Sequence, residues 1–157
     1  MKFADFMCFE ATLPELEVPD RDGVIEALVS SLNKAGKVKR GAYKDLVKAV
    51  VDREKEASTG IGKGVAVPHV KHSSVKEVVG VVGLSGSGID FHSLDKQPVF
   101  SIILLVSHPD VPDHHLQAME TVFRHLQQEK FRRFLRQCRT GEAIEDLLRE
   151  ADTRTSW

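Results

Sequence analysis

The chain has 157 residues, the size of one compact domain, which nearly excludes a two-domain enzyme. Its 41% hydrophobic and 29% charged residues supply a core and solubility, which excludes global disorder. Lys and Arg number 22 against 23 Asp and Glu, so the broad basic face needed for nucleic acid or an anionic bilayer is not expected. We predict a single domain over residues 1–157, with residues 1–19 and 152–157 loosely ordered.

The cysteines and the apolar runs indicate where in the cell the protein is expected to work. Cys8 and Cys138 lie far apart and neither belongs to a CxxC motif, which indicates reduced thiols. The N-terminus has no secretion signal, and no run approaches the roughly 18 to 20 apolar residues of a membrane span. We expect a cytoplasmic protein that does not insert into membranes.

Two helices are predicted in the first third of the chain. Residues 20–36 place apolar side chains at helical spacing between a capping Asp20 and a terminating Gly36. Residues 41–58 repeat the helical period, and this second helix is expected to end near residues 53–56.

The middle of the chain predicts a glycine-rich loop and three strands. Three glycines within residues 60–64 argue against a regular element there, and residues 65–68 form a short strand. Residues 77–84 predict a strand buried on both faces that Gly86 and Gly88 break. Residues 98–107 are the most apolar run and predict the central strand.

The last third predicts three helices after an irregular segment with two prolines, residues 108–113. Asp113 is expected to cap a helix over 114–128, followed by helices over 129–138 and 140–150 and a loose tail. Helices, then strands, then helices indicate an α/β fold in which a single mixed sheet is flanked by helices on both faces.

Seven histidines are many for this length, and several lie in loops. His69 directly follows Pro68 at the end of a short strand, where a side chain is held rigidly yet faces solvent. A metal site could involve His69 with His72, or the histidines at 108, 114 and 115, but a completing Cys or Glu at helical spacing is missing. We therefore predict no metal and no cofactor. His92 has no evident role, and His125 is expected to be solvated.

Lys63 lies in the glycine-rich segment and could suggest a phosphate-binding P-loop. The G-K-[ST] ending and the following helix are both missing, so we reject a P-loop. No serine or cysteine stands in a recognisable nucleophile motif, which disfavours a hydrolase.

One stretch carries a specific family resemblance. Residues 53–69, REKEASTGIGKGVAVPH, resemble the active-site signature of the enzyme IIA domains of the bacterial phosphotransferase system, in the fructose/mannitol class that includes the nitrogen-regulatory IIA proteins. Residues 91–99 and the pair His115-Leu116 resemble later landmarks of that family. In order and length the resemblance covers about residues 20–151.

The resemblance implies a role for each matching residue. His69 matches the histidine that accepts a phosphoryl group from phospho-HPr, His115 a supporting histidine, and Arg53 an arginine that stabilises the phosphoryl group. Nε2 is the nitrogen usually phosphorylated, so a neighbour is expected to hold Nδ1. The loop that supports the site comprises Ser58, Thr59, Gly60 and Gly62. Val70 departs from the family, which usually has a small residue there.

The residue types fit this chemistry, because phosphoryl transfer needs a nucleophile in line and cationic or N–H groups around the phosphoryl oxygens. A regulatory phosphocarrier is favoured by the S-T-G-I-G loop and the lack of attached HPr, IIB or membrane domains. The expected partners are an HPr-like donor and a regulated cytosolic protein. The alternatives are a sugar-specific IIA component that passes the phosphoryl group to a IIB domain, and a binding module that has lost transfer.

Overall fold

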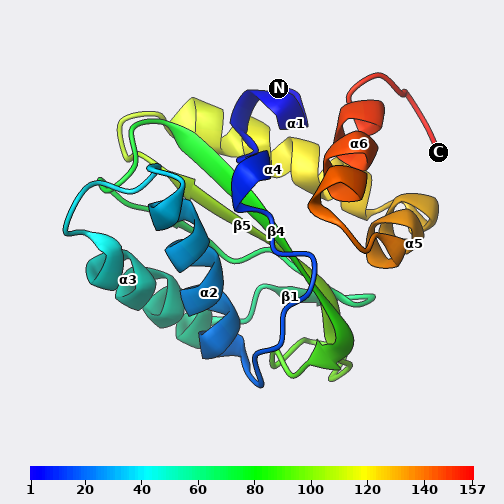
Figure 1. Ribbon diagram of the computed structural model, residues 1–157, viewed down its shortest axis with the longest axis horizontal. Coiled ribbons are helices and arrows are strands. Elements are labelled where there is room, and N and C mark those ends of the chain that lie inside the picture. The colour runs from blue at the N-terminus through cyan, green and yellow to red at the C-terminus, as the bar shows by residue number, and fades with distance from the viewer.

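A computed structural model describes all of residues 1–157 as one open mixed sheet between two layers of helices (Figure 1). This architecture confirms the predicted α/β fold. The elements in chain order are α1 (Phe3–Phe6), a 3-10 turn η1 (Phe9–Ala11), α2 (Arg21–Lys34), α3 (Tyr43–Glu56), β1 (Gly60–Gly62), β2 (Val65–Ala66), β3 (His69–Lys71), β4 (Val78–Ile89), β5 (Val99–Ser107), α4 (Pro112–Leu126), α5 (Glu129–Gln137) and α6 (Gly141–Ala151).

Strand β5 lies at the centre of the sheet, as its apolar run predicted. On one side it pairs in parallel with both β2 and β3, and on the other it pairs antiparallel with β4. Short β1 adds to β2 as an antiparallel edge. Pro68 interrupts the line between β2 and β3 because it lacks an N–H, yet its carbonyl still accepts from Leu105 N at 3.0 Å. His69 therefore begins a new strand already aligned on β5.

The two faces of the sheet carry separate cores of similar size, with 21 and 19 buried residues. Alternation along β5 distributes its side chains between them: Ile102 and Leu104 face one core, whereas Ile103 and Leu105 face the other. Helices α2 and α3 cover the first face, and α1, α4, α5 and α6 cover the second (Figure 1). Burial on both faces explains why residues 78–84 of β4 and 102–106 of β5 are continuously apolar in sequence.

The predicted helices are present, with one difference at a helix start. The Asp20 side chain accepts from Gly23 N at 2.7 Å and caps α2, as predicted. The predicted cap at Asp113 is wrong, because α4 begins at Pro112, two residues before the predicted start at residue 114, and Val111 is its N-cap. Pro is favourable at a first helical position, where its missing N–H costs nothing, and Asp113 lies within the first turn. No helix combines the length and apolarity needed to cross a bilayer.

Two glycine-rich segments are more regular than predicted. Gly86 and Gly88 do not end β4, which continues to Ile89 with a register shift between Leu84 and Ile89. A Cβ at Gly88 would lie 2.9 Å from the Pro98 side chain, so glycine allows a close approach rather than a break. Residues 60–62, expected to be loop, form β1 because β2 offers a free edge for pairing.

Both chain ends pack on the second core. Phe3 is fully buried and stacks on Phe131, with ring centroids 6.0 Å apart, and its backbone N donates to Asp152 Oδ1 at 2.7 Å. Trp157 packs against Phe131 in an edge-to-face arrangement, with 5.5 Å between ring centroids. The expectation that His125 is solvated is wrong: it is 6% exposed, and its Nδ1 lies 2.8 Å from the Thr121 carbonyl. Its burial follows from the N-terminal segment, which covers it with Phe3.

Candidate functional site

The backbone holds the His69 ring in one orientation. Its Nδ1 lies 2.8 Å from the carbonyl oxygen of Val67, two residues earlier. A carbonyl can only accept a hydrogen bond, so Nδ1 carries the proton, and in the neutral ring Nε2 keeps its lone pair. The ring is half-buried at the start of β3. His69 therefore presents a nucleophilic Nε2, and Val67 is the neighbour expected to hold Nδ1.

His115 lies beside His69, with ring centroids 5.9 Å apart and planes 47° from parallel. It sits in the first turn of α4, is 7% exposed, and its Nδ1 lies 2.5 Å from Ser107 Oγ at the end of β5. The structure thus brings together two histidines that are 46 positions apart in the sequence.

The surroundings of His115 favour its neutral form. Burial lowers the pKa of His115, and the positive charge of Lys71, and of His69 whenever it is protonated, lowers it further. A doubly negative phosphoryl group on His69 would have the opposite effect, because a nearby anion stabilises the imidazolium. His115 can therefore take up a proton when negative charge arrives beside it.

Lys71 was not singled out from the sequence. It follows His69 by two residues on β3, so both side chains lie on the same face of that strand. Its side chain is exposed and its charge is felt at His115. The period of two along a strand is the sequence signal that could have identified it.

Arg53 does not contact either histidine through a hydrogen bond. It lies in the last turn of α3, where its Nη1 donates to the Ala57 carbonyl at 3.0 Å. This bond satisfies a carbonyl at the helix end, a structural use of a basic residue at that place. The role of Arg53 in stabilising a phosphoryl group stays a prediction.

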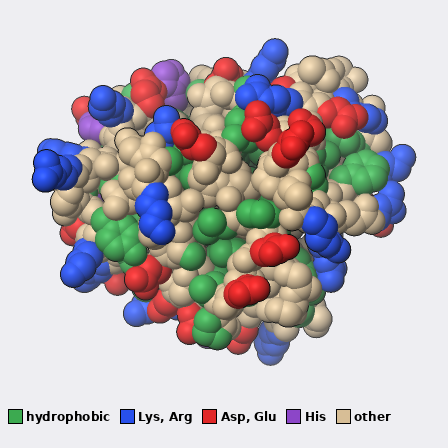
Figure 2. All heavy atoms as spheres, in the orientation of Figure 1, with side chains coloured by type: hydrophobic (Ala, Val, Ile, Leu, Met, Phe, Trp, Pro, Cys, Tyr) green, Lys and Arg blue, Asp and Glu red, His purple; other side chains and the backbone are tan.

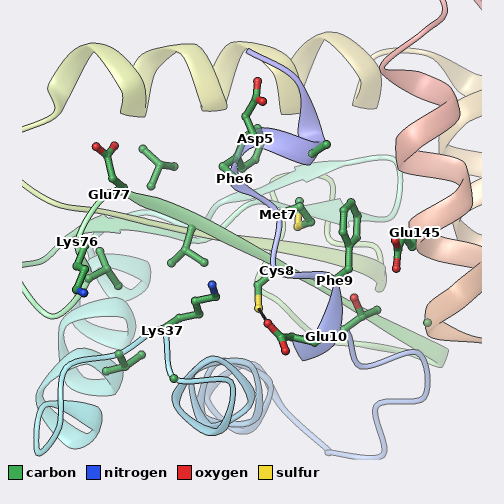
Figure 3. A pocket seen from close by; sticks show the side chains of 18 of the residues that line it. Asp5, Phe6, Met7, Cys8, Phe9, Glu10, Lys37, Lys76, Glu77 and Glu145 are labelled. Atoms are coloured by element: carbon green, nitrogen blue, oxygen red, sulfur yellow. Dashed lines mark hydrogen bonds between the residues drawn. The ribbon is translucent and has the colours of Figure 1, made fainter.

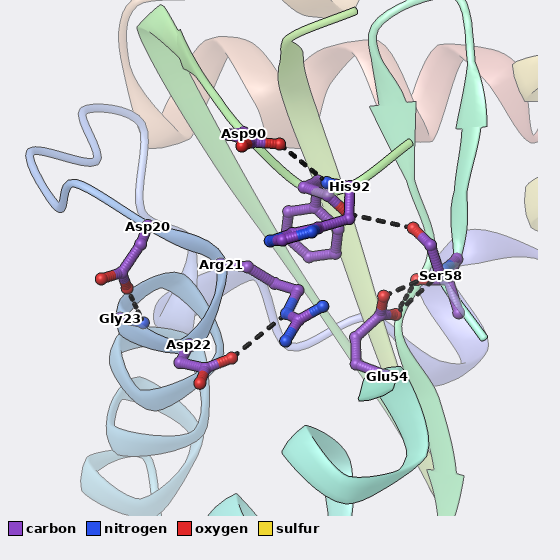
Figure 4. Close-up of polar contacts among 10 residues, drawn as sticks. Asp20, Arg21, Asp22, Gly23, Glu54, Ser58, Asp90 and His92 are labelled. Carbon is purple, nitrogen blue, oxygen red and sulfur yellow. Dashed lines mark hydrogen bonds and ion pairs between the residues drawn. The ribbon is translucent and has the colours of Figure 1, made fainter. Parts of the chain in front are cut away.

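The supporting loop is fastened by a buried carboxylate whose role the sequence analysis missed. Glu54 is 1% exposed and accepts from Thr59 N at 3.0 and 3.2 Å and from Thr59 Oγ1 (Figure 4). The Thr59 carbonyl in turn accepts from Val67 N at 3.1 Å. Hydrogen bonds thus run from Glu54 through Thr59 to the residue that holds His69. Glu54 follows the buried Val50 by four residues in α3, and this helical spacing is the sequence signal that could have indicated its burial.

The rest of the loop is anchored to the segment after β4. Ser58 Oγ donates to the Phe91 carbonyl at 2.9 Å and accepts from Gly60 N at 3.0 Å. A Cβ at Gly60 would lie 2.3 Å from Ser93 Oγ, so this close approach requires glycine. Gly62 has a φ of 94°, which glycine adopts without strain. The predicted loop residues are therefore anchored to Glu54 and to residues 91–95, and Thr59 pairs with Val67 just before His69.

The other histidines are engaged elsewhere. His72 Nε2 lies 2.8 Å from Asp45, and His114 Nδ1 lies 3.1 Å from Glu77. No three His, Cys, Asp or Glu side chains gather in a group able to hold a metal ion. The histidine groupings considered for a metal thus do not form a ligand set.

A groove of about 1260 Å³ lies apart from the two rings, along the N-terminal segment (Figure 3). Positively charged lysines and negatively charged glutamates line this groove. Cys8 also lines it, and burial is the chief cause that raises the pKa of its thiol. None of the predicted site residues lines this groove. The candidate site is therefore the His69–His115 pair and not the groove.

The fold is an α/β sandwich, and its candidate site is a pair of histidines, the half-buried His69 on β3 and the buried His115 in the first turn of α4. The family model described as "Phosphoenolpyruvate-dependent sugar phosphotransferase system, EIIA 2" matches residues 9–151. The chain belongs to this family, a phosphotransfer component of that system, and the resemblance noted in residues 53–69 is confirmed.

Relatives carry two kinds of name. The fructose-specific EIIABC component of Bacillus subtilis is 33% identical over 153 residues, which cover 97% of this chain and 24% of that protein. The chain thus spans about a quarter of the length of that relative. A nitrogen regulatory protein of Bradyrhizobium diazoefficiens is 30% identical over 148 residues, covering 94% of this chain and 95% of the relative.

Solved structures agree on the fold. The nitrogen regulatory protein IIA-Ntr of Neisseria meningitidis superposes with a TM-score of 0.82 at 23% identity, covering 93% of this chain and 98% of that one. IIA mannitol of Escherichia coli gives a TM-score of 0.73 at 21% identity, covering 88% and 96%. Regulatory and sugar-specific proteins share this architecture, so the fold alone does not separate them.

Proposed function

We propose that this chain is a phosphocarrier that accepts a phosphoryl group on His69 Nε2 from a phosphohistidine donor protein of the HPr type. The observation that carries the proposal is the Nδ1 hydrogen bond to the Val67 carbonyl, 2.8 Å long, which leaves Nε2 as the free nucleophile. Membership of the EIIA family supports the same role.

The chemical step is an in-line displacement. The Nε2 lone pair of His69 attacks phosphorus, the new N–P bond forms, and the bond from phosphorus to the donor's nitrogen breaks and returns its electron pair to that nitrogen. The proton stays on His69 Nδ1, which donates it to the Val67 carbonyl throughout. His115 takes up a proton from solvent as the dianion arrives, and Lys71 adds positive charge from the same strand face.

The openness of the site suits a carrier, because a partner protein must reach the phosphoryl group directly. His69 is half-buried, and Leu116, which follows His115 in the sequence, is 66% exposed. An exposed apolar side chain in the same helical turn as His115 suits contact with a protein. Such a donor works in the cytoplasm, where we expect this protein to function.

We favour a regulatory carrier, whose binding to cytosolic partners depends on the phosphorylation of His69. The S-T-G-I-G loop and the similarity to a nitrogen regulatory protein over 95% of that protein's length support this choice. A sugar-specific IIA component is the second candidate, supported by the 33% identity to the fructose-specific Bacillus subtilis protein. In that case His69 passes its phosphoryl group to a IIB domain.

The test is intact mass after incubation with phosphoenolpyruvate, enzyme I and HPr. One acid-labile phosphoryl adduct is expected on the wild-type chain and on His114→Ala, an exposed neighbouring histidine, but none on His69→Ala. An adduct of equal yield on folded His69→Ala would overturn the assignment, and no adduct on the wild type with active donors would favour the binding module. Rapid passage of the group to a purified fructose-type IIB domain would favour the sugar-specific candidate.

A further inference from the structure

A second hollow, of about 920 Å³, lies along α5, away from the His69–His115 pair. Four arginines, at positions 132, 133, 136 and 139, and Lys63 line it, against the carboxylates Glu15, Glu17 and Glu129. Cations therefore outnumber carboxylates here, although the whole chain has a net charge of −1. We call this hollow the arginine groove. Figure 2 shows Lys and Arg side chains along the edge of the molecule where Figure 1 places α5.

The four arginines contact uncharged groups. Arg132 Nη1 donates to the Leu126 carbonyl at 2.8 Å, and Arg139 Nη1 donates to the carbonyls of Arg136 and Cys138 at 3.1 and 3.2 Å. The Arg133 guanidinium lies 5.7 Å from the Phe134 ring centroid. None of the four forms an ion pair with a carboxylate, unlike Arg149 and Arg154 on and after α6. Their guanidinium groups are therefore not paired with a carboxylate in the structure.

Arg136 forms the best-defined part of the groove. Its guanidinium carbon lies 3.5 Å from the centre of the Phe100 ring, a stacked cation–π contact. Gly64 and Gly88 both have a positive φ and lie close to this ring. A Cβ at Gly64 would lie 3.2 Å from the Phe100 ring, and a Cβ at Gly88 would lie 3.0 Å from the ring and 2.9 Å from the Pro98 side chain. The ring therefore sits in a tight slot between two glycines. A guanidinium stacked on a fixed ring keeps its N–H edge free for an anion.

The arginine groove is separate from the histidine pair. Phe100 and Ser101 lie at the start of β5, whereas Ser107, which contacts His115, lies at its end. Six residues of strand separate the two places, roughly 20 Å at about 3.3 Å per residue. A ligand in the groove would not touch the atoms that carry the phosphoryl group.

We propose that the arginine groove binds a small molecule with two or more phosphate groups. Arg132, Arg133 and Arg136 lie on one side of α5 within about one turn, so their N–H groups can contact adjacent phosphates together. The volume is in the range of small-molecule sites. Glu15 and Glu17 also line the groove and would repel an acidic protein segment lying along its whole length, whereas a compact ligand can contact the arginines alone.

The test measures the binding of pyrophosphate to the full chain, by calorimetry and by changes in amide chemical shifts. Pyrophosphate is expected to bind at least about tenfold more tightly than inorganic phosphate, because it engages two arginines at once. Its shifts are expected on α5 and near Phe100. The double variant Arg133→Gln/Arg136→Gln is expected to lose at least about tenfold in affinity. The control Arg124→Gln removes an exposed arginine of α4 outside the groove and should bind as the wild type does.

Arg139→Gln guards against a folding artefact, because this exposed guanidinium contacts only nearby backbone carbonyls. A several-fold loss of pyrophosphate affinity with an unchanged melting curve supports the proposal. Equal affinity in wild type and groove variants, or shifts centred on His69 and His115, would overturn it. Binding of a polyglutamate peptide in preference to pyrophosphate would overturn it as well, in favour of a protein partner. Phosphorylation of His69 is measured in a separate experiment. A failure of the phosphocarrier proposal can therefore be distinguished from a failure of the arginine-groove proposal.

Discussion

Replacing Glu54 by alanine tests whether a buried carboxylate holds the site in place. The substitution leaves the N–H and hydroxyl of Thr59, itself 6% exposed, without their acceptor. Each buried group left unpaired costs about 1–3 kcal/mol, and relief from burying the carboxylate offsets part of that cost. We expect the free energy of unfolding to fall by about 2–4 kcal/mol.

The same substitution should slow transfer beyond its effect on stability. Without Glu54, Thr59 is free to shift, and the Val67 carbonyl that orients His69 loses its fixed position. We expect a lower maximal rate of phosphorylation by phospho-HPr with little change in the donor concentration that gives half the maximal rate. Glu54→Gln keeps one acceptor oxygen for Thr59 N and should recover part of both losses.

Urea unfolding and rapid-quench phosphorylation provide the two measurements. Glu56→Ala is the matched control, since Glu56 ends the same helix and is exposed. An unfolding free energy for Glu54→Ala within about 0.5 kcal/mol of the Glu56→Ala value would refute the reasoning. A normal maximal rate in a destabilised Glu54→Ala protein would refute the positioning role alone.

The remaining predictions concern pH and a helix cap. The pKa of His115 lies below its ordinary 6.5 in the folded chain, chiefly through burial, so the unfolded chain binds its proton first as pH falls. The urea midpoint should therefore decline below about pH 6.5, and less steeply in His115→Gln; parallel slopes would contradict this. Asp20→Ala removes the acceptor for Gly23 N and should cost about 1 kcal/mol of unfolding free energy, whereas Asp22→Ala should cost less.

The sequence by itself determined the elements with strong local signals. The period of α2 and its capping Asp20, and the apolar run of β5, are local properties, and each appears in the structure as predicted. The general succession of helices, strands and helices is also present, although α1, β1 and β3 were not predicted. The signature in residues 53–69 likewise gave the family, because a motif at fixed spacing needs no knowledge of distant contacts.

Only the tertiary structure decided which residues meet across the fold. The 5.9 Å approach of His69 and His115 depends on β3 and α4 meeting beside the end of β5. The burial of His125 depends on Phe3, more than a hundred residues away, and the course of β4 past Gly86 depends on pairing with β5. Glu54 acts on His69 through Thr59 and Val67, three links that no local period reveals. Such contacts join distant segments, so they are fixed by packing and pairing and not by the spacing of residues along the chain.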